Sequence, residues 1–261
     1  MSGSPALTDP GEEAGGGLGD AARAAAIRST IAGRHFRLLF QPVVSLADRK
    51  PRHYEALLRP APMGGAPHAS TQEFVRFAEA AGLSRELDQA VLDEALAVLG
   101  KTPWVALAVN LSGLSLQDPA FCGYLLARVR EASVLCARLL VEVTETAEIE
   151  NVATARSTLA ALREAGVPVG LDDFGAGAAA FRYLRDFRVD FIKIDGTYLR
   201  AALRSPRAHA MLGSMVSLAQ GASAQVVVEM IETEEQEALC RAIGADLGQG
   251  WLYGKPGRLP G

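Results

Sequence analysis

Short apolar runs alternate with amphipathic stretches through most of the chain. Eight apolar runs, most without a polar face, start at Phe36; they span 36–44, 53–59, 104–112, 138–145, 167–173, 190–195, 224–232 and 248–253. A strand that is apolar on both faces is typical of a sheet covered by helices. The runs therefore predict eight buried strands.

The stretches between these runs have the spacing of amphipathic helices, within 72–82, 84–99, 147–165, 205–220 and 233–244. Ser84 and Thr233 are predicted N-caps, and glycines are predicted to end helices at Gly82, Gly100, Gly166 and Gly244. Strands alternating with helices predict an α/β fold with a parallel sheet. About eight such units favour a (β/α)8 TIM-like barrel. An open doubly wound sheet is the alternative.

The first part of the chain has a different composition. Residues 1–28 are rich in Gly, Ser, Pro and Glu, which predicts a flexible tail. Residues 29–258 are then expected to form one domain. The first residues contain neither a basic leader nor an apolar segment, so no secretory signal is expected.

Charge and cysteine content narrow the classes of partner. The formal net charge of −4 offers no basic field for polymeric nucleic acid. No apolar stretch reaches the roughly 18 residues of a membrane segment. Cys122, Cys136 and Cys240 are odd in number and widely separated, which predicts reduced thiols in a cytoplasmic protein.

Polar residues interrupt or end the apolar runs. They are Glu55, Asn110, Glu142, Glu145, Asp172, Asp173, Lys193, Glu229 and Gln249. An unpaired carboxylate in such surroundings is costly. In a barrel the carboxyl ends of the strands meet at one mouth, which predicts that these groups face one another. Oxygen ligands without His or Cys favour Mg²⁺ or Mn²⁺ over zinc.

Two enzyme classes fit these residue types. Asp172 and Asp173 leave a strand into a Gly-rich turn, which suits a two-metal site for hydrolysis of a phosphate ester. The alternative is enolase-like proton abstraction, with Lys193 as the base. Taken singly, Lys193 also fits a structural counter-ion to Asp195 or Glu229, and Asn110 fits a turn former.

At these residues the chain resembles the EAL-domain family of cyclic di-GMP phosphodiesterases. Nine motifs stand in the family's order: QPVVSL (41–46), Glu55-Ala56-Leu57 within YEALLRP, EFVRFAEAAGL (73–83), VNLS (109–112), VEVTET (141–146), LDDFGAG (171–177), FIKIDG (191–196), VVEMIET (227–233) and QGWLYGKP (249–256). The resemblance implies a modified barrel whose first strand is antiparallel. It also implies hydrolysis of cyclic di-GMP to linear pGpG with two Mg²⁺ or Mn²⁺ ions.

The resemblance also implies roles for single residues. Glu55, Asn110, Glu142 and Asp172 would bind one metal, and Asp172, Asp173 and Glu229 the other. Lys193 would orient the attacking water, and Gln249 would support the second metal site. Glu145 would stabilise a loop. Gln41, Leu57 and Arg59 would contact the nucleotide, with Arg59 on a phosphate. A homodimer is implied as well.

The chain departs from the family pattern in two places. Ala178, Ala179 and Ala180 replace a Tyr and two Ser in the loop after Asp173. Met230 stands where the family has Gly, with Val228 in place of Ala, and we expect its side chain to tilt Glu229. Two hypotheses follow: a phosphodiesterase slowed by these changes, or a weak or inactive receptor of cyclic di-GMP that signals to a protein partner. A scaffold that binds no nucleotide is a third.

Overall fold

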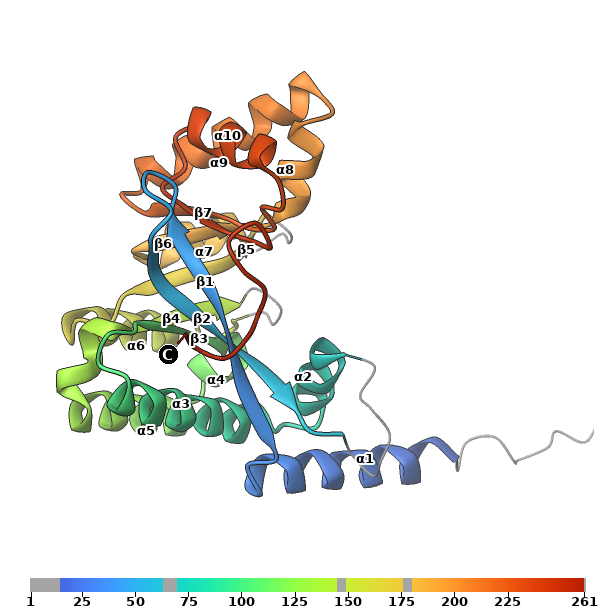
Figure 1. The fold of residues 1–261 in the computed structure, drawn as a ribbon. Helices are drawn as coiled ribbons and strands as arrows, with labels where there is room; N and C mark the ends of the chain where they lie inside the picture. Colours follow the sequence, from blue (N-terminus) through green and yellow to red (C-terminus); the bar gives the residue numbers. More distant parts are fainter. Residues whose placement is uncertain (1–14, 63–69, 145–148, 176–179, 261) are drawn as a thin grey trace, which may run out of the picture.

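A computed structural model describes residues 15–62, 70–144, 149–175 and 180–260 of the chain. In these residues the eight predicted strands form a closed barrel (Figure 1). The strands are β1 (Phe36–Ser45), β2 (Pro51–Pro60), β3 (Leu107–Ser112), β4 (Leu139–Thr144), β5 (Val169–Phe174), β6 (Phe191–Ile194), β7 (Gln225–Val228) and β8 (Leu247–Gln249). Each lies within or beside the apolar run that predicted it.

Strand β1 runs antiparallel to both of its neighbours, β2 and β8, whereas all other neighbouring strands are parallel. The modified barrel is therefore confirmed, and the open doubly wound sheet is wrong. The register pairs Gln41 with Glu55 and Val43 with Gln249. This register places Gln41 beside two of the predicted site residues.

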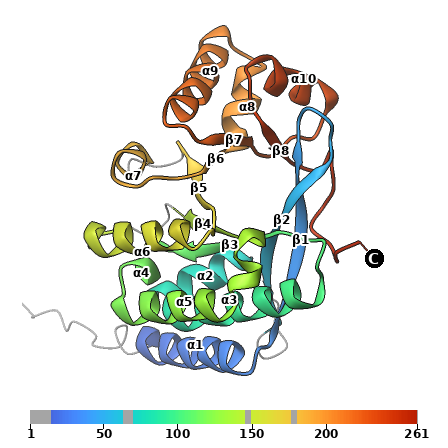
Figure 2. The same cartoon turned by 90° about the vertical axis from the view of Figure 1, so that its left-hand side faces the viewer.

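Helices pack along most of the outer side of the barrel (Figure 2). The five predicted helices are present as α2 (Thr71–Ala80), α3 (Ser84–Lys101), α6 (Val152–Glu164), α9 (Pro206–Gly221) and α10 (Glu234–Ala242). Others were not predicted: α1 (Gly15–Ala32), α4 (Gly113–Leu116), α5 (Pro119–Glu131), α7 (Ala180–Asp186), α8 (Gly196–Ala202) and the 3-10 helix η1 (Ser133–Arg138).

Helix ends agree with the sequence in part. Thr233 caps α10 through a capping box with Gln236. The prediction for Ser84 is wrong: Leu83 is the N-cap residue of α3, and the Ser84 hydroxyl is buried without a hydrogen-bond partner. Gly100 lies inside α3, which continues to Lys101. A glycine without a left-handed backbone does not by itself end a helix.

Helix α1 overlaps the segment that the composition assigned to a flexible tail. Its second half is alanine-rich, which favours a helix, and its Ile27 and Ile31 side chains are buried against the core. Arg23 forms an ion pair with Glu73 of α2 over 2.7 Å and lies over the Phe77 ring. Residues 15–28 are therefore not a free tail, because burial of the isoleucines offsets the cost of ordering them.

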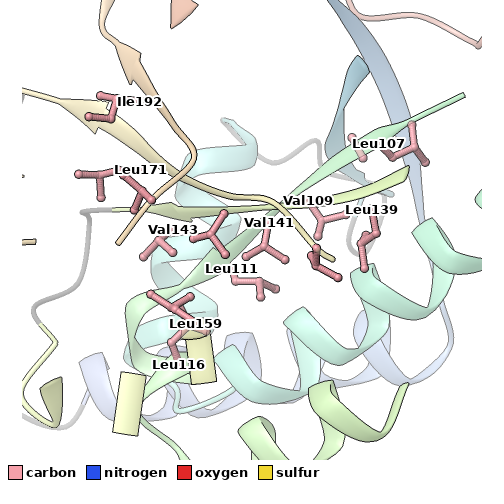
Figure 3. Packing of buried hydrophobic residues seen from close by; sticks show 14 of the residues in the cluster. Leu107, Val109, Leu111, Leu116, Leu139, Val141, Val143, Leu159, Leu171 and Ile192 are labelled. Carbon is pink, nitrogen blue, oxygen red and sulfur yellow. The ribbon is translucent and has the colours of Figure 1, made fainter. Parts of the chain in front are cut away.

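Alternation along the strands separates the core from the barrel interior. Leu107, Val109 and Leu111 of β3 pack with Val141 and Val143 of β4 in the layer between strands and helices (Figure 3). The intervening residues, which include Asn110 and Glu142, point to the opposite face, into the barrel. The interior therefore receives the polar side chains.

The barrel interior has an apolar layer of its own. Val43, Phe191, Val227 and Leu247 pack there with Leu140 as a separate buried cluster. Lys193 follows Phe191 by two residues on β6 and lies nearer the carboxyl end of that strand. Both side chains point into the barrel, so the polar site lies directly above this apolar layer. In the described residues no helix is both long and apolar enough to cross a membrane.

Candidate functional site

Lys193 lies at the centre of a ring of carboxylates in the barrel mouth. Its ammonium nitrogen Nζ is 2.9 Å from Glu142 Oε2, 2.9 Å from Glu229 Oε1, 3.1 Å from Glu55 Oε2 and 3.1 Å from Asp172 Oδ1. These acids lie on β2, β4 and β5 and directly after β7. Residues far apart in the sequence thus meet, as predicted.

Two amide side chains complete the ring around Glu55. Asn110 Nδ2 donates to Glu55 Oε1 over 2.7 Å, and Gln249 Nε2 donates to Glu55 Oε2 over 2.7 Å. Gln249 also lies 3.4 Å from Gln41 Oε1, and Gln41 Nε2 donates to the Gly254 carbonyl over 3.1 Å. Asn110 therefore lies within β3 and against Glu55 rather than in a turn, and Gln249 lies against the same carboxylate.

Burial and charge shift the pKa values in opposite directions. Burial raises the pKa of Glu142 well above its usual value, that of Asp172 to a lesser degree, and that of Glu229 to about 8. Burial also opposes ionisation of Glu55, but Lys193 and the two amide donors lower its pKa overall. Lys193 stays protonated because the surrounding carboxylates outweigh its own burial and raise its pKa.

The donor set fits hard divalent cations. If ionised, the four carboxylates that contact Lys193 carry three negative charges more than that one lysine can neutralise. Among the side chains of the ring, three buried oxygens have no hydrogen-bond partner: Asn110 Oδ1, Glu142 Oε1 and Gln249 Oε1. Such orphaned acceptors are costly unless a cation or water meets them. Oxygens with this excess charge suit Mg²⁺ or Mn²⁺.

The acids form two groups whose oxygens are within 4.8 Å of one another. One group is Glu55, Glu142 and Asp172, and the other is Asp172, Asp173 and Glu229. Asp172 belongs to both, as a bridging ligand would. The resemblance assigns the same acids to two metal sites, with Asn110 in the first, and that assignment stays a prediction.

Asp173 is held by an unusual backbone at the end of β5. Its φ of 55° is left-handed, and burial raises the pKa of its half-exposed carboxyl to about 6, with Asp172 adding to the shift. The next turn is fixed by Tyr198 of α8, whose hydroxyl donates to the Gly175 carbonyl. Sequence reasoning missed Tyr198, since no local signal connects it with residue 175.

Predicted substrate-contacting residues lie at the periphery. Leu57 and Arg59 follow Glu55 on β2; Arg59 is half-buried and donates to the Leu58 carbonyl over 2.7 Å. Among the hydrogen bonds of the described residues, neither side chain bonds to the ring, so their contact with a nucleotide stays a prediction. Glu145, Ala178 and Ala179 lie outside the described residues, and Ala180 is the first residue of α7.

Met230 does not displace Glu229 from the ring. The Met230 side chain is partly exposed, and its sulfur lies 3.2 Å from Arg200 Nη1. Glu229 Oε1 remains 2.9 Å from Lys193 Nζ. Glu229 thus keeps its contact with Lys193 while Met230 adopts a left-handed backbone with φ of 56°, and the tilt of the Glu229 carboxylate stays a prediction.

Comparisons with known proteins agree with this geometry. The family model described as EAL domain matches residues 24–256. Over 228 residues the chain is 33% identical to the cyclic di-GMP phosphodiesterase PA2567 of Pseudomonas aeruginosa, covering 85% of this chain and 38% of that protein. It is 30% identical to the cyclic di-GMP phosphodiesterase PdeF of Escherichia coli, covering 88% of this chain and 31% of that protein. The chain thus spans less than half the length of these curated relatives.

Two solved structures have a fold similar to that of this chain. The FimX EAL domain of Pseudomonas aeruginosa bound to c-di-GMP has a TM-score of 0.80 and 26% identity, covering 91% of this chain and 97% of that one. A structure titled PaMucR phosphodiesterase, c-di-GMP complex, has a TM-score of 0.79 and 26% identity, covering 91% and 98%.

Proposed function

Because the chain belongs to the EAL domain family, we propose that it hydrolyses cyclic di-GMP to linear pGpG with two divalent cations, Mg²⁺ or Mn²⁺. The observation that carries this proposal is the ring of acids around Lys193, which has four carboxyl groups around one cation and three orphaned oxygens. Divalent cations would neutralise those carboxylates and meet the free oxygens. A receptor that only binds nucleotide has no chemical need for such a ring.

The cation sites follow from the two acid groups. Glu55, Asn110, Glu142 and Asp172 would hold one ion, and Asp172, Asp173 and Glu229 the other. When bound, two such ions lower the pKa of a water and neutralise charge on a phosphodiester. In the hydrolysis, the water oxygen forms a new bond to phosphorus and the bond from phosphorus to O3′ breaks. One water proton then goes to the O3′ leaving group and the other to solvent.

The protein's own residues supply orientation and binding. Lys193 keeps its proton on Nζ and donates it as a hydrogen bond to the water. Gln249 holds Glu55 and supports the second site through water. Gln41, Leu57 and Arg59 line the mouth toward the nucleotide, where the Arg59 guanidinium suits a phosphate. Lys193 thus acts by orientation rather than as a base.

The test is turnover by the purified chain. With Mn²⁺ or Mg²⁺, cyclic di-GMP is expected to yield pGpG, and chelation with EDTA is expected to stop the reaction. Glu55→Gln removes one metal-binding charge and is expected to abolish turnover. Glu235→Gln, on the exposed first turn of α10, is the matched control and should match the wild type.

Absence of pGpG, or turnover that survives Glu55→Gln, refutes the proposal. Tight binding of cyclic di-GMP without turnover in either metal would instead establish the receptor, which the departures at Ala178–Ala180 and Met230 motivated. That receptor would act through a protein partner.

Assembly and location belong to the same proposal. The protein acts in the cytoplasm as a homodimer. Family resemblance supports the dimer, and the buried free thiols Cys122, Cys136 and Cys240 support a reducing compartment. Analytical ultracentrifugation at micromolar concentration tests the dimer, which a purely monomeric sedimentation profile contradicts.

A further inference from the structure

Side chains from two helices hold the turn directly after Asn110. Ser112 ends β3 and is the N-cap of α4. Its backbone N–H donates to Asp88 Oδ2 over 2.9 Å, and its hydroxyl donates to Glu79 Oε1 over 2.9 Å. Asp88 lies on α3 and Glu79 on α2. The outer helices therefore contact the strand end that carries a predicted metal ligand.

The neighbouring strand does not supply this support. Pairing of β2 with β3 ends at Ala56 and Val109, one residue before Asn110. Pairing of β3 with β4 continues to Ser112. Among the strand pairs of the described residues, the end of β3 is thus held on one edge only. Asp88 provides the acceptor that the second edge lacks.

Burying the Asp88 carboxyl group lowers the stability of the fold. Its relative exposure is 7%, and burial raises its pKa to about 7. The charge of Glu79 raises this pKa further. Within the described residues, Asp88 forms no ion pair with a cation. A buried carboxyl without a cation lowers stability, but leaving a buried N–H unmet is costly as well. The Ser115 side chain and the hydrogen bond from the Ser112 N–H oppose that rise in pKa, and the carboxyl meets an N–H that no strand accepts.

We propose that Asp88 is a positioning residue for Asn110: by accepting the Ser112 N–H it fixes the carboxyl end of β3 and keeps Asn110 Oδ1 directed at the first cation. The inference rests on the proposed metal-dependent function. Asn110 is already held on its other side, where Nδ2 donates to Glu55 over 2.7 Å. Its Oδ1 is buried without a partner, as a free ligand atom would be.

The experiment measures Mn²⁺ affinity by electron paramagnetic resonance, together with hydrogen exchange of the Ser112 amide in the metal-free protein. Asp88→Ala is expected to weaken Mn²⁺ binding about tenfold, since outer partners of metal ligands have effects of this size. It should also speed exchange at Ser112. Asp88→Asn keeps an acceptor oxygen and is expected to restore affinity to within about threefold of the wild type.

The matched control is Asp93→Ala on the same helix. Asp93 pairs with Arg34 and Arg128 on the outer surface, so its loss should lower stability without changing Mn²⁺ affinity. If Asp88→Ala fails to fold, Asp88→Leu, which fills the volume but offers no acceptor, takes its place with the same expectation.

Two results overturn the inference. One is a folded Asp88→Ala or Asp88→Leu protein that binds Mn²⁺ like the wild type. The other is an equal loss of affinity in Asp93→Ala. A wild-type protein that binds no Mn²⁺ refutes the proposed function instead, so the two failures are distinguishable.

Discussion

Met230 occupies a backbone conformation that suits glycine, and replacing it should stabilise the protein. Its φ is 56°. The neighbouring hydrogen bonds impose this turn, because the Glu229 N–H donates to the Ile194 carbonyl over 3.0 Å and the Ile231 N–H donates to the Gln249 carbonyl over 3.0 Å. The chain must turn between these two bonds whatever residue stands at 230.

The expected magnitude follows from the backbone. A residue with a Cβ pays about 1–2 kcal/mol in the left-handed region, whereas glycine does not. Part of this gain is offset by the greater freedom of glycine in the unfolded chain. The contact between the exposed Met230 sulfur and Arg200 contributes little at the surface. We expect Met230→Gly to raise the free energy of unfolding by about 1 kcal/mol, or about 2–4 °C in Tm.

Met230→Ala is the control that isolates the Cβ. Alanine loses the contact with Arg200 but keeps the strained backbone, so it should not be more stable than the wild type. Urea unfolding followed by circular dichroism measures all three proteins. Equal stability of Met230→Gly and Met230→Ala would refute the assignment of strain to this backbone.

Three further predictions concern the site and its supports. Lys193→Met should abolish pGpG formation and lower Tm at pH 7, because the carboxylates lose their internal cation. Added Mn²⁺ should restore Tm but not turnover. Retained turnover would contradict the role of Lys193. Tyr198→Phe removes the hydroxyl that donates to the Gly175 carbonyl, so the free energy of unfolding measured in urea should fall by about 1 kcal/mol and turnover should fall as well. Unchanged stability and turnover would contradict this role of Tyr198. Hydrogen bonds from Arg49 lower the pKa of Glu237 to about 2, so this pair adds stability above the ordinary pKa of a glutamate and loses it as pH falls toward 2. Glu237→Gln should therefore lower Tm at pH 7 and much less at pH 3, and equal losses at both values would contradict the linkage.

The position of Lys193 explains how four acids can lie together in the barrel mouth. The Lys193 ammonium lies within 3.1 Å of one oxygen from each of four carboxyl groups. Burial raises the pKa of Glu142, Asp172 and Glu229, which lets protons take up the remaining charge. Divalent cations would displace those protons, so metal binding is expected to release protons to the solvent.

The sequence alone determined the strands and most of the candidate site. Strands buried on both faces have continuous apolar runs, so polar residues that interrupt them, such as Glu55, Glu142 and Lys193, stand out. That signal is local, and it needs no knowledge of which strands are neighbours. The family motifs then predicted a barrel whose first strand runs antiparallel to its neighbours, and the strand pairing confirmed it.

Only the tertiary structure decided how those residues interact. Barrel closure determines that Lys193 lies beside four acids. Packing of the helices on the barrel determines that Asp88 and Tyr198 bond to the ends of strands. Each of these contacts joins residues that are more than twenty positions apart, so no local pattern in the sequence reveals it. The order of α1 depends on a surface for Ile27 that helices α2 and α3 provide. The left-handed turn at Met230 comes from hydrogen bonds to two other strands. Local sequence sets what each residue offers, and the closed barrel sets which partner it meets.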